Sequence, residues 1–183
     1  DFTEFLRKKT NILANAFEQD KKFLPLPNVL KSNKGTPNPQ QIEAPIQQDL
    51  IEKEVENVTK KDYRLLKNNN YEVFLAPYQE IPNIMKEIGR LREITFREVG
   101  EGTNASSDVD KFDLYYHHLF LWDNEAKKIA GAYRMGLGAE IFPKYGIEGF
   151  YTHDLFRFEP ELYDMMSKTI EMGRAFIISE YQQ

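Results

Sequence analysis

The sequence predicts a mixed α/β fold built on one sheet. Four apolar runs have the length of strands, and two longer stretches carry apolar residues at every third or fourth position, as amphipathic helices do. The composition, 41% hydrophobic and 13% aromatic, is sufficient for a core. With 183 residues, the chain is long enough for one domain and an attached segment.

The start of the chain differs from the rest. Residues 1–17 place apolar side chains along one broad stripe and predict a helix, which is too small to form a domain. Residues 18–45 contain five of the nine prolines, a composition typical of a linker. Because the first residue is Asp1 rather than methionine, we expect this region to be the helical tail of an upstream domain and its tether.

The first half of the remaining chain predicts two helices around one strand. Apolar spacing favours a helix over residues 45–66, ended by KNNN, and a second helix over residues 81–98. Between them, YEVFLAPY at 71–78 predicts a strand that Pro77 closes. The stretch EGTNASSD at 101–108 is polar, so we expect a mobile loop there.

The second half predicts three strands. Residues 117–123 and 129–137 flank the turn DNEAKK and together indicate a hairpin. An irregular stretch rich in glycine and aromatic residues follows, and we expect residues 156–169 to end in a short helix. Residues 170–178, IEMGRAFII, predict the last strand.

Composition excludes several classes of function. The chain has no cysteine, which rules out disulfides, thiolate metal sites and a cysteine nucleophile, and fits a cytoplasmic location. The net charge of -5 argues against a nucleic-acid binder, which would need a basic face. No apolar run approaches the roughly 18 residues of a membrane span. His117 and His118 would point to opposite faces of a strand, so we expect no metal site.

Two charges interrupt the last strand. Burying Glu171 and Arg174 is costly unless they are paired. Residues three apart in a regular strand face opposite sides, so the two can share a site only if the strand bulges, which Gly173 would tolerate. The alternative is a structural ion pair that closes the sheet.

Three further sets of residues are candidates. Arg92 and Phe96 lie four apart and share a helix face, although Arg92 could simply be solvated beside a core phenylalanine. Asp110 and Asp113 are paired carboxylates that could hold a substrate ammonium group, bind a metal or act in proton transfer, or form a capping turn. Arg134 interrupts a hairpin strand, where it could reach solvent at the sheet edge or anchor an anion.

Taken in order, these residues resemble a known family. The phrases FDLYYHHLFLWD, KIAGAYRMG and IEMGRAFI, with the charged set above, are similar to acyl-homoserine-lactone synthases. They also resemble the N-acyl amino acid synthases that make ornithine and glycine lipids, some of which carry the label hemolysin. All of these are similar to the GNAT acyltransferase superfamily, whose fold is a central mixed sheet flanked by helices.

The resemblance implies transfer of a fatty acyl group, commonly 3-hydroxyacyl, from acyl carrier protein or acyl-CoA to the α-amine of an amino acid, with no bound cofactor. Glu171 would be the base, and the acceptor carboxylate would suit Arg174 or Arg134. A backbone N–H near Phe176 or Ile177 would bind the oxyanion. The full expected set is Asp110, Asp113, Glu171 and Arg174 around the reacting centre, with Arg92, Phe96, Arg134 and Phe176 as substrate-binding residues.

The resemblance also implies that part of the domain is missing. A GNAT-type domain should continue beyond Gln183 into the helix and strands that hold the phosphopantetheine arm of the donor. We therefore expect residues 46–183 to be a partial N-acyltransferase domain, with weak or no activity alone.

A carrier protein is acidic, and the second predicted helix is locally basic. Lys86, Arg90 and Arg97 could form a docking face on it, or an ordinary solvated face. Two other functions remain open, a non-catalytic module that binds a carrier or lipid and a membrane-active hemolysin, which the mean hydropathy of -0.59 disfavours. An enzyme of aminolipid synthesis could also associate peripherally with the inner face of the cytoplasmic membrane.

Overall fold

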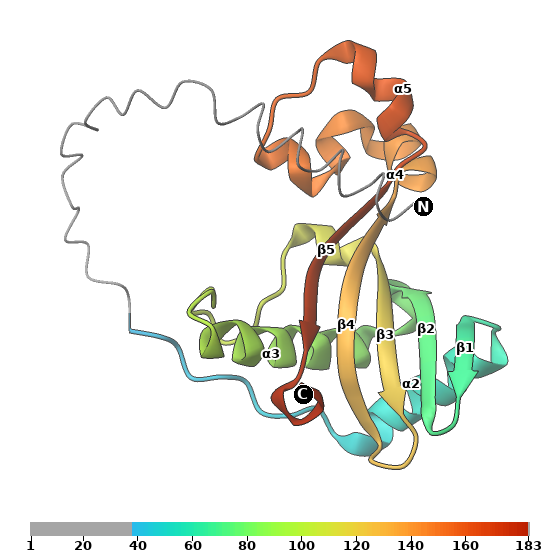
Figure 1. Cartoon of the computed structure of the whole chain (residues 1–183), viewed down its shortest axis with the longest axis vertical. Coiled ribbons are helices and arrows are strands. Elements are labelled where there is room, and N and C mark those ends of the chain that lie inside the picture. Colours follow the sequence, from blue (N-terminus) through green and yellow to red (C-terminus); the bar gives the residue numbers. More distant parts are fainter. Residues whose placement is uncertain (1–37, 183) are drawn as a thin grey trace, which may run out of the picture. The chain divides into compact units, whose positions relative to one another are not determined.

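The computed structural model describes residues 38–182 (Figure 1). The predicted helix at 1–17 and the linker up to residue 37 lie outside the described residues. The described part contains both helices and strands. Their order is α2 (Gln48–Lys60), β1 (Arg64–Asn68), β2 (Tyr71–Pro77), α3 (Pro82–Glu98), β3 (His117–Asp123), β4 (Lys128–Leu137), α4 (Gly138–Tyr145), α5 (Tyr163–Met166) and β5 (Ile170–Ile177).

One five-stranded sheet organises the molecule, with the strands side by side in the order β1-β2-β3-β4-β5. The α/β prediction is confirmed, and the boundaries of β2, β3, β4 and β5 agree with the predicted strands to within one residue. One detail differs. All strand pairings within residues 38–182 are antiparallel, whereas we expected a mixed sheet.

The first predicted helix extends too far, because its last predicted residues form a strand instead. α2 ends at Lys60, and Asp62 then adopts a left-handed backbone with φ of 63°. Residues Arg64–Asn68 form β1 instead, an exposed edge strand paired with β2. The sequence KNNN, interpreted as a helix stop, is the turn of this hairpin. Asn69 there has φ of 52°, a conformation that asparagine tolerates well.

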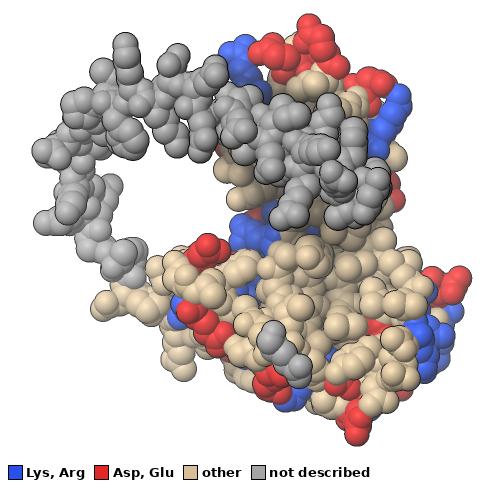
Figure 2. All heavy atoms as spheres, in the orientation of Figure 1, with Lys and Arg blue, Asp and Glu red and all other residues tan. Residues whose placement is uncertain are grey.

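Helices α2 and α3 cover one face of the sheet. Their apolar side chains pack on Phe74 and Phe120, whose rings stack at 5.1 Å between centroids. In Figure 1 the strands lie in front of these two helices. The other face carries half-buried Leu75, Leu119 and Leu121, and Figure 2 shows this side of the sheet mostly free of charged side chains.

A second, smaller core lies at the end of the sheet, where α4 and α5 connect β4 to β5 (Figure 1). Its buried members are Phe112, Tyr116, Ile141, Phe150 and Met166. The short helix at the end of residues 156–169 is confirmed by α5, whereas α4 falls in the stretch predicted to be irregular. None of the helices among the described residues is long and apolar enough to cross a membrane.

The predicted mobile loop is anchored. Glu93 of α3 is buried and accepts hydrogen bonds from the backbone N–H groups of Thr103 at 3.0 Å and Asn104 at 2.9 Å. From the other side, the N–H of Gln40 donates to the Asn104 carbonyl at 2.9 Å. The prediction of a loop is confirmed, and a buried carboxylate satisfies two of the backbone donors of this loop.

Candidate active site

Strand β5 bulges where the charged residues lie. Ala132 pairs with Phe176 and Arg134 with Gly173, so β5 has one residue more than β4 over this interval. The prediction of a bulge near Gly173 is confirmed, but the left-handed residue is Arg174, with φ of 53°. A non-glycine residue in this conformation is strained and is common at functional sites.

Three arginines and three aspartates form one ion-pair network beside the bulge. Arg92 projects from α3 and is 1% exposed. Its Nε donates to Asp108 Oδ2 at 2.9 Å, and Nη2 donates to Asp113 Oδ2 at 2.9 Å. Because each charge has an opposite partner, the network can stay ionised although it is buried.

Asp110 joins the other two arginines. Its Oδ1 accepts from Arg134 Nη1 at 2.7 Å, and its Oδ2 accepts from Arg174 Nη2 at 3.2 Å. Asp110 also caps a short 3-10 helix, Lys111–Leu114, and forms a capping box with Asp113. The capping interpretation of this aspartate pair is therefore confirmed, and the pair also takes part in the ion-pair network.

The arginines keep Asp113 ionised. Burial opposes the charge on Asp113, but the positive charge and hydrogen bonds of Arg92 and the charge of Arg134 outweigh it, so its pKa is below the usual range. His118 lies beneath, with Nε2 2.9 Å from the Asp113 carbonyl. Burial lowers the pKa of His118 to about 4, so the ring is neutral near pH 7.

Glu171 is held on a second set of donors. Its carboxylate accepts from the Tyr116 hydroxyl, from the N–H of Tyr151 at 3.0 Å and from the N–H of Thr152 at 2.8 Å. Burial and the Glu171 acceptor raise the pKa of Tyr116, which remains a hydroxyl donor. Gly136, opposite Glu171 on β4, makes room for the Tyr116 ring, since a Cβ there would lie 2.6 Å from it.

Two hollows, of about 520 and 140 Å³, meet at this place. The larger is lined by Arg174 and Phe96, and the smaller by Glu171. Both share Arg134, Tyr151 and Gly173. The bulge thus brings a guanidinium and a carboxylate from one strand to adjoining hollows, an arrangement that suits a ligand with both an amine and a carboxylate.

The predicted residues divide into accessible and buried groups. Arg174 and Asp110 have side chains 21% and 26% exposed, and Phe96 lines the larger hollow. Arg92 and Asp113 are 1% and 0% exposed, so the expectation that they contact substrate is corrected: they position other residues. The side chain of Phe176 belongs to the main core, so this residue could offer a ligand only its backbone, the role expected for it from the sequence.

Two alternatives weighed for the arginines are wrong. Arg92 is not a solvated arginine, and Arg134, 2% exposed, does not reach solvent at the sheet edge. Cation–π contacts help to stabilise Arg134 in its buried position, since its guanidinium carbon lies 5.4 Å from the Tyr116 ring centroid and 5.1 Å from that of Tyr151.

Of the predicted docking residues, only Lys86 is exposed. Arg90 donates Nε to Glu87 at 2.9 Å, and Arg97 donates Nε to Glu93 at 2.7 Å. Both guanidinium groups are engaged within the fold, so their charges are partly neutralised.

Four residues that contact the site were not identified from the sequence: Asp108, Tyr116, Tyr151 and Thr152. Asp108 lies at the end of a stretch that we interpreted as a polar loop. Tyr116 and Tyr151 have the character of ordinary core residues in the sequence. An aspartate that closes a polar loop two residues before another aspartate was the available signal.

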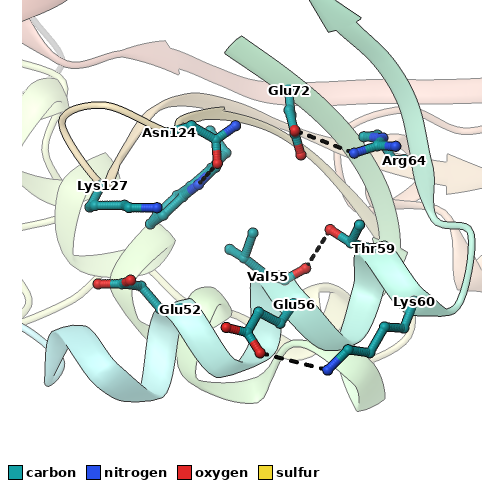
Figure 3. Close-up of a pocket in the computed structure, with 10 residues that line it drawn as sticks. Glu52, Val55, Glu56, Thr59, Lys60, Arg64, Glu72, Asn124 and Lys127 are labelled. Carbon is teal, nitrogen blue, oxygen red and sulfur yellow. Dashed lines mark hydrogen bonds and ion pairs between the residues drawn. The ribbon is translucent and has the colours of Figure 1, made fainter. Parts of the chain in front are cut away.

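Another hollow, of about 280 Å³, lies between α2 and strands β1 and β2 (Figure 3). Four of its charged side chains form ion pairs, Arg64 with Glu72 at 3.3 Å and Lys60 with Glu56 at 3.6 Å. None of the predicted site residues lines it. It is therefore separate from the predicted site.

Comparisons with known proteins found a family model and two relatives that match this chain. Residues 91–183 match the family described as acetyltransferase (GNAT) domain. The chain is 38% identical over 148 residues to a glycine N(alpha)-acyltransferase of Phocaeicola vulgatus, covering 78% of this chain and 45% of that protein. It is 35% identical to a glycine N(alpha)-acyltransferase of Bacteroides thetaiotaomicron, covering 78% and 43%.

The chain thus spans less than half the length of these curated relatives. No solved structure gave a significant match. The matched family model covers β3, β4 and β5, and so includes Arg134 on β4 and Glu171 and Arg174 on β5. The chain belongs to the GNAT acetyltransferase family.

Proposed function

We propose that this chain is part of an N-acyltransferase that joins a fatty acyl group to the α-amine of a small amino acid, with glycine as the first candidate. The observation that carries the proposal is the pair Glu171 and Arg174, which open onto adjoining hollows. The names of the two relatives support the choice of glycine.

The acceptor would bind across the bulge. Arg174 would pair with its carboxylate, and Glu171 would receive its amine from the smaller hollow. Gly173 lies between them, and a Cβ there would meet no atom within 4 Å. A short acceptor with few atoms between amine and carboxylate suits this spacing.

Glu171 would take the proton from the amine, directly or through a water molecule. The amine nitrogen would then attack the carbonyl carbon of an acyl thioester, the C–S bond would break, and the thiolate would leave and take up a proton. Three donors fix the Glu171 carboxylate, so its position does not depend on the ligand. Acyl carrier protein or CoA would supply the thioester, and a 3-hydroxyacyl chain is the first acyl group to test.

The oxyanion would be bound by the backbone of β5. The N–H of Ile178 donates to the Ala130 carbonyl at 3.0 Å, toward β4. Because N–H directions alternate along a strand, that of Ile177 is directed to the outer edge of β5. The Ile177 carbonyl, which accepts from Gln182 Nε2 at 2.5 Å, supports this direction. Ile177 is therefore the better candidate of the two residues considered for this role.

The donor protein would meet α3 at Lys86, the exposed cation of that helix, if it is an acidic carrier. A non-catalytic module that binds the carrier or a lipid is the second candidate. The buried, charge-balanced network is as compatible with binding as with catalysis. Replacing Glu171 distinguishes the two candidate functions, because only the enzyme requires a base at this position.

Lipid mass spectrometry of cells that express the full-length protein tests the proposal. We expect N-acylglycine from wild type, loss of at least about a hundredfold in the Glu171→Gln variant, and normal product from the control Glu148→Gln at an exposed position. Carrier binding should remain in E171Q. Unchanged lipid output in E171Q would favour the binding module.

A further inference from the structure

Asp108 is fixed firmly against α3. Its side chain is 3% exposed, and its N–H donates to the Gly89 carbonyl at 3.1 Å. Gly89 permits this contact, because a Cβ there would lie 2.4 Å from the Val109 side chain. The position of Asp108 is therefore set by the helix rather than by the loop that precedes it.

The carboxylate of Asp108 is divided between two arginines. Oδ2 accepts from Arg92 Nε at 2.9 Å, and Oδ1 accepts from Arg174 Nη1. Arg92 is buried in the network, whereas Arg174 faces the larger hollow. Asp108 thus connects the rigid helix to the guanidinium that can meet a ligand.

Arg174 needs such a connection. Its left-handed backbone, with φ of 53°, is unfavourable for a residue with a Cβ and persists only when contacts hold it. Its other carboxylate partner is Asp110, at 3.2 Å. Asp110 also binds Arg134 at 2.7 Å and caps a 3-10 helix, so it is shared among several tasks. Each aspartate gives one carboxylate oxygen to Arg174, but only Asp108 also binds Arg92 of helix α3.

We infer that Asp108 is a positioning residue for acceptor recognition: it holds Arg174 in the bulge so that the remaining N–H donors of the guanidinium face the acceptor carboxylate. This inference rests on the proposed function. A guanidinium carries five N–H donors, and Asp108 and Asp110 together use one on Nη1 and one on Nη2. Within residues 38–182 the other three donors have no hydrogen-bond acceptor, so they can meet a carboxylate.

Steady-state kinetics of the full-length enzyme test the inference. Asp108→Asn keeps the size of the side chain but replaces one acceptor oxygen by a donor that repels a guanidinium. We expect the KM for glycine to rise on the order of tenfold, while the KM for the acyl thioester stays unchanged. Asp164→Asn, at an exposed position on α5, is the matched control and should change neither constant.

Measuring D108N in an Arg174→Ala background distinguishes a positioning role of Asp108 from a general loss of structure. If Asp108 acts through Arg174, D108N should leave the glycine KM of R174A unchanged. A similar rise in both backgrounds, or no rise in either, would overturn the inference. If D108N does not fold, Asp108→Glu carries the same comparison, since it retains the charge but displaces the carboxylate.

Amide hydrogen exchange provides a readout that needs no turnover. D108N should speed the exchange of residues 173 to 176 relative to D164N, because the bulge loses the contact that holds it. Equal exchange in the two variants would contradict the inference. Absence of N-acylglycine from wild type would instead count against the proposed function, and the exchange result would still decide the role of Asp108.

Discussion

Arg174 combines a strained backbone with a side chain that the site requires. Left-handed backbone costs a residue with a Cβ roughly 1–2 kcal/mol, and glycine avoids this cost. Arg174→Ala and Arg174→Gly both remove the guanidinium, so they differ only in the backbone. We expect R174G to be more stable than R174A by about 1 kcal/mol, measured as the free energy of unfolding in urea.

The neighbouring residue supplies the control. Ala175 lies beside Arg174 in the same bulge but is not among the residues with positive φ. There Ala175→Gly should lose about 0.5–1 kcal/mol, the opposite sign, because glycine has more backbone freedom to lose on folding. Equal stability of R174A and R174G would show that residue 174 relaxes out of the left-handed conformation.

Sequence reasoning identified the charged residues better than it identified their roles. Glu171 and Arg174 could be paired in advance because charges in an apolar strand need partners and glycine tolerates a bulge. Which side chains remain accessible could not be predicted. Arg92 and Arg174 look alike in the sequence. Contacts between segments far apart in the chain bury Arg92 and leave Arg174 partly exposed at a hollow.

At the scale of elements, Glu93 links α3 to the loop that carries Asp108. Burial opposes its charge, but hydrogen bonds from Thr103 and Arg97 prevail and hold the pKa of Glu93 below its usual range. Glu93→Gln replaces one acceptor oxygen by a donor and leaves loop N–H groups unsatisfied. We expect a loss of about 1–3 kcal/mol in unfolding free energy and faster amide exchange at Thr103 and Asn104.

A surface carboxylate on the other helix is the comparison. Glu56→Gln, at a side chain 71% exposed, should change stability by less than about 0.5 kcal/mol and leave the loop amides protected. Protection of Thr103 and Asn104 unaffected by E93Q would mean that the contacts from Gln40 suffice to hold the loop.

The elements show where periodicity succeeds. Long or strictly alternating patterns, as in α3 and β3, placed helices and strands correctly. The pattern failed at β1, where Leu65 and Leu66 continue the helical spacing of α2. There a local turn at Asn69 and pairing with β2 decide the structure. The spacing of apolar residues records neither the turn conformation nor the strand pairing.

At the scale of the whole molecule, the resolved shifts of the acidic and histidine side chains share one sign. The pKa values of Glu72, Glu93, Asp113 and Asp123 are lowered, and that of His118 falls to about 4. In each case the unfolded chain binds a proton at a higher pH than the folded protein. Stability therefore falls on acidification, first between about pH 6.5 and 4 through His118, then lower through the carboxylates.

His118 accounts for the upper part of this dependence. Burial disfavours its charged form, and the charges of Arg92 and Arg134 add to this, whereas Asp113 opposes it. From an unfolded value of 6.5, the histidine should reduce the free energy of unfolding by about 2 kcal/mol between pH 7 and pH 5. Urea titrations at the two pH values should show this slope in wild type and its loss in His118→Gln.

The slope separates protonation from packing. H118Q can lower stability at pH 7 through its shape, but that loss is the same at pH 5 and leaves no slope. His153→Gln, a half-buried histidine outside the ion-pair network, should keep the slope of wild type. A slope between pH 7 and pH 5 that persists in H118Q would contradict the assignment to His118, because the lowered pKa of Asp113 places its protonation at a lower pH.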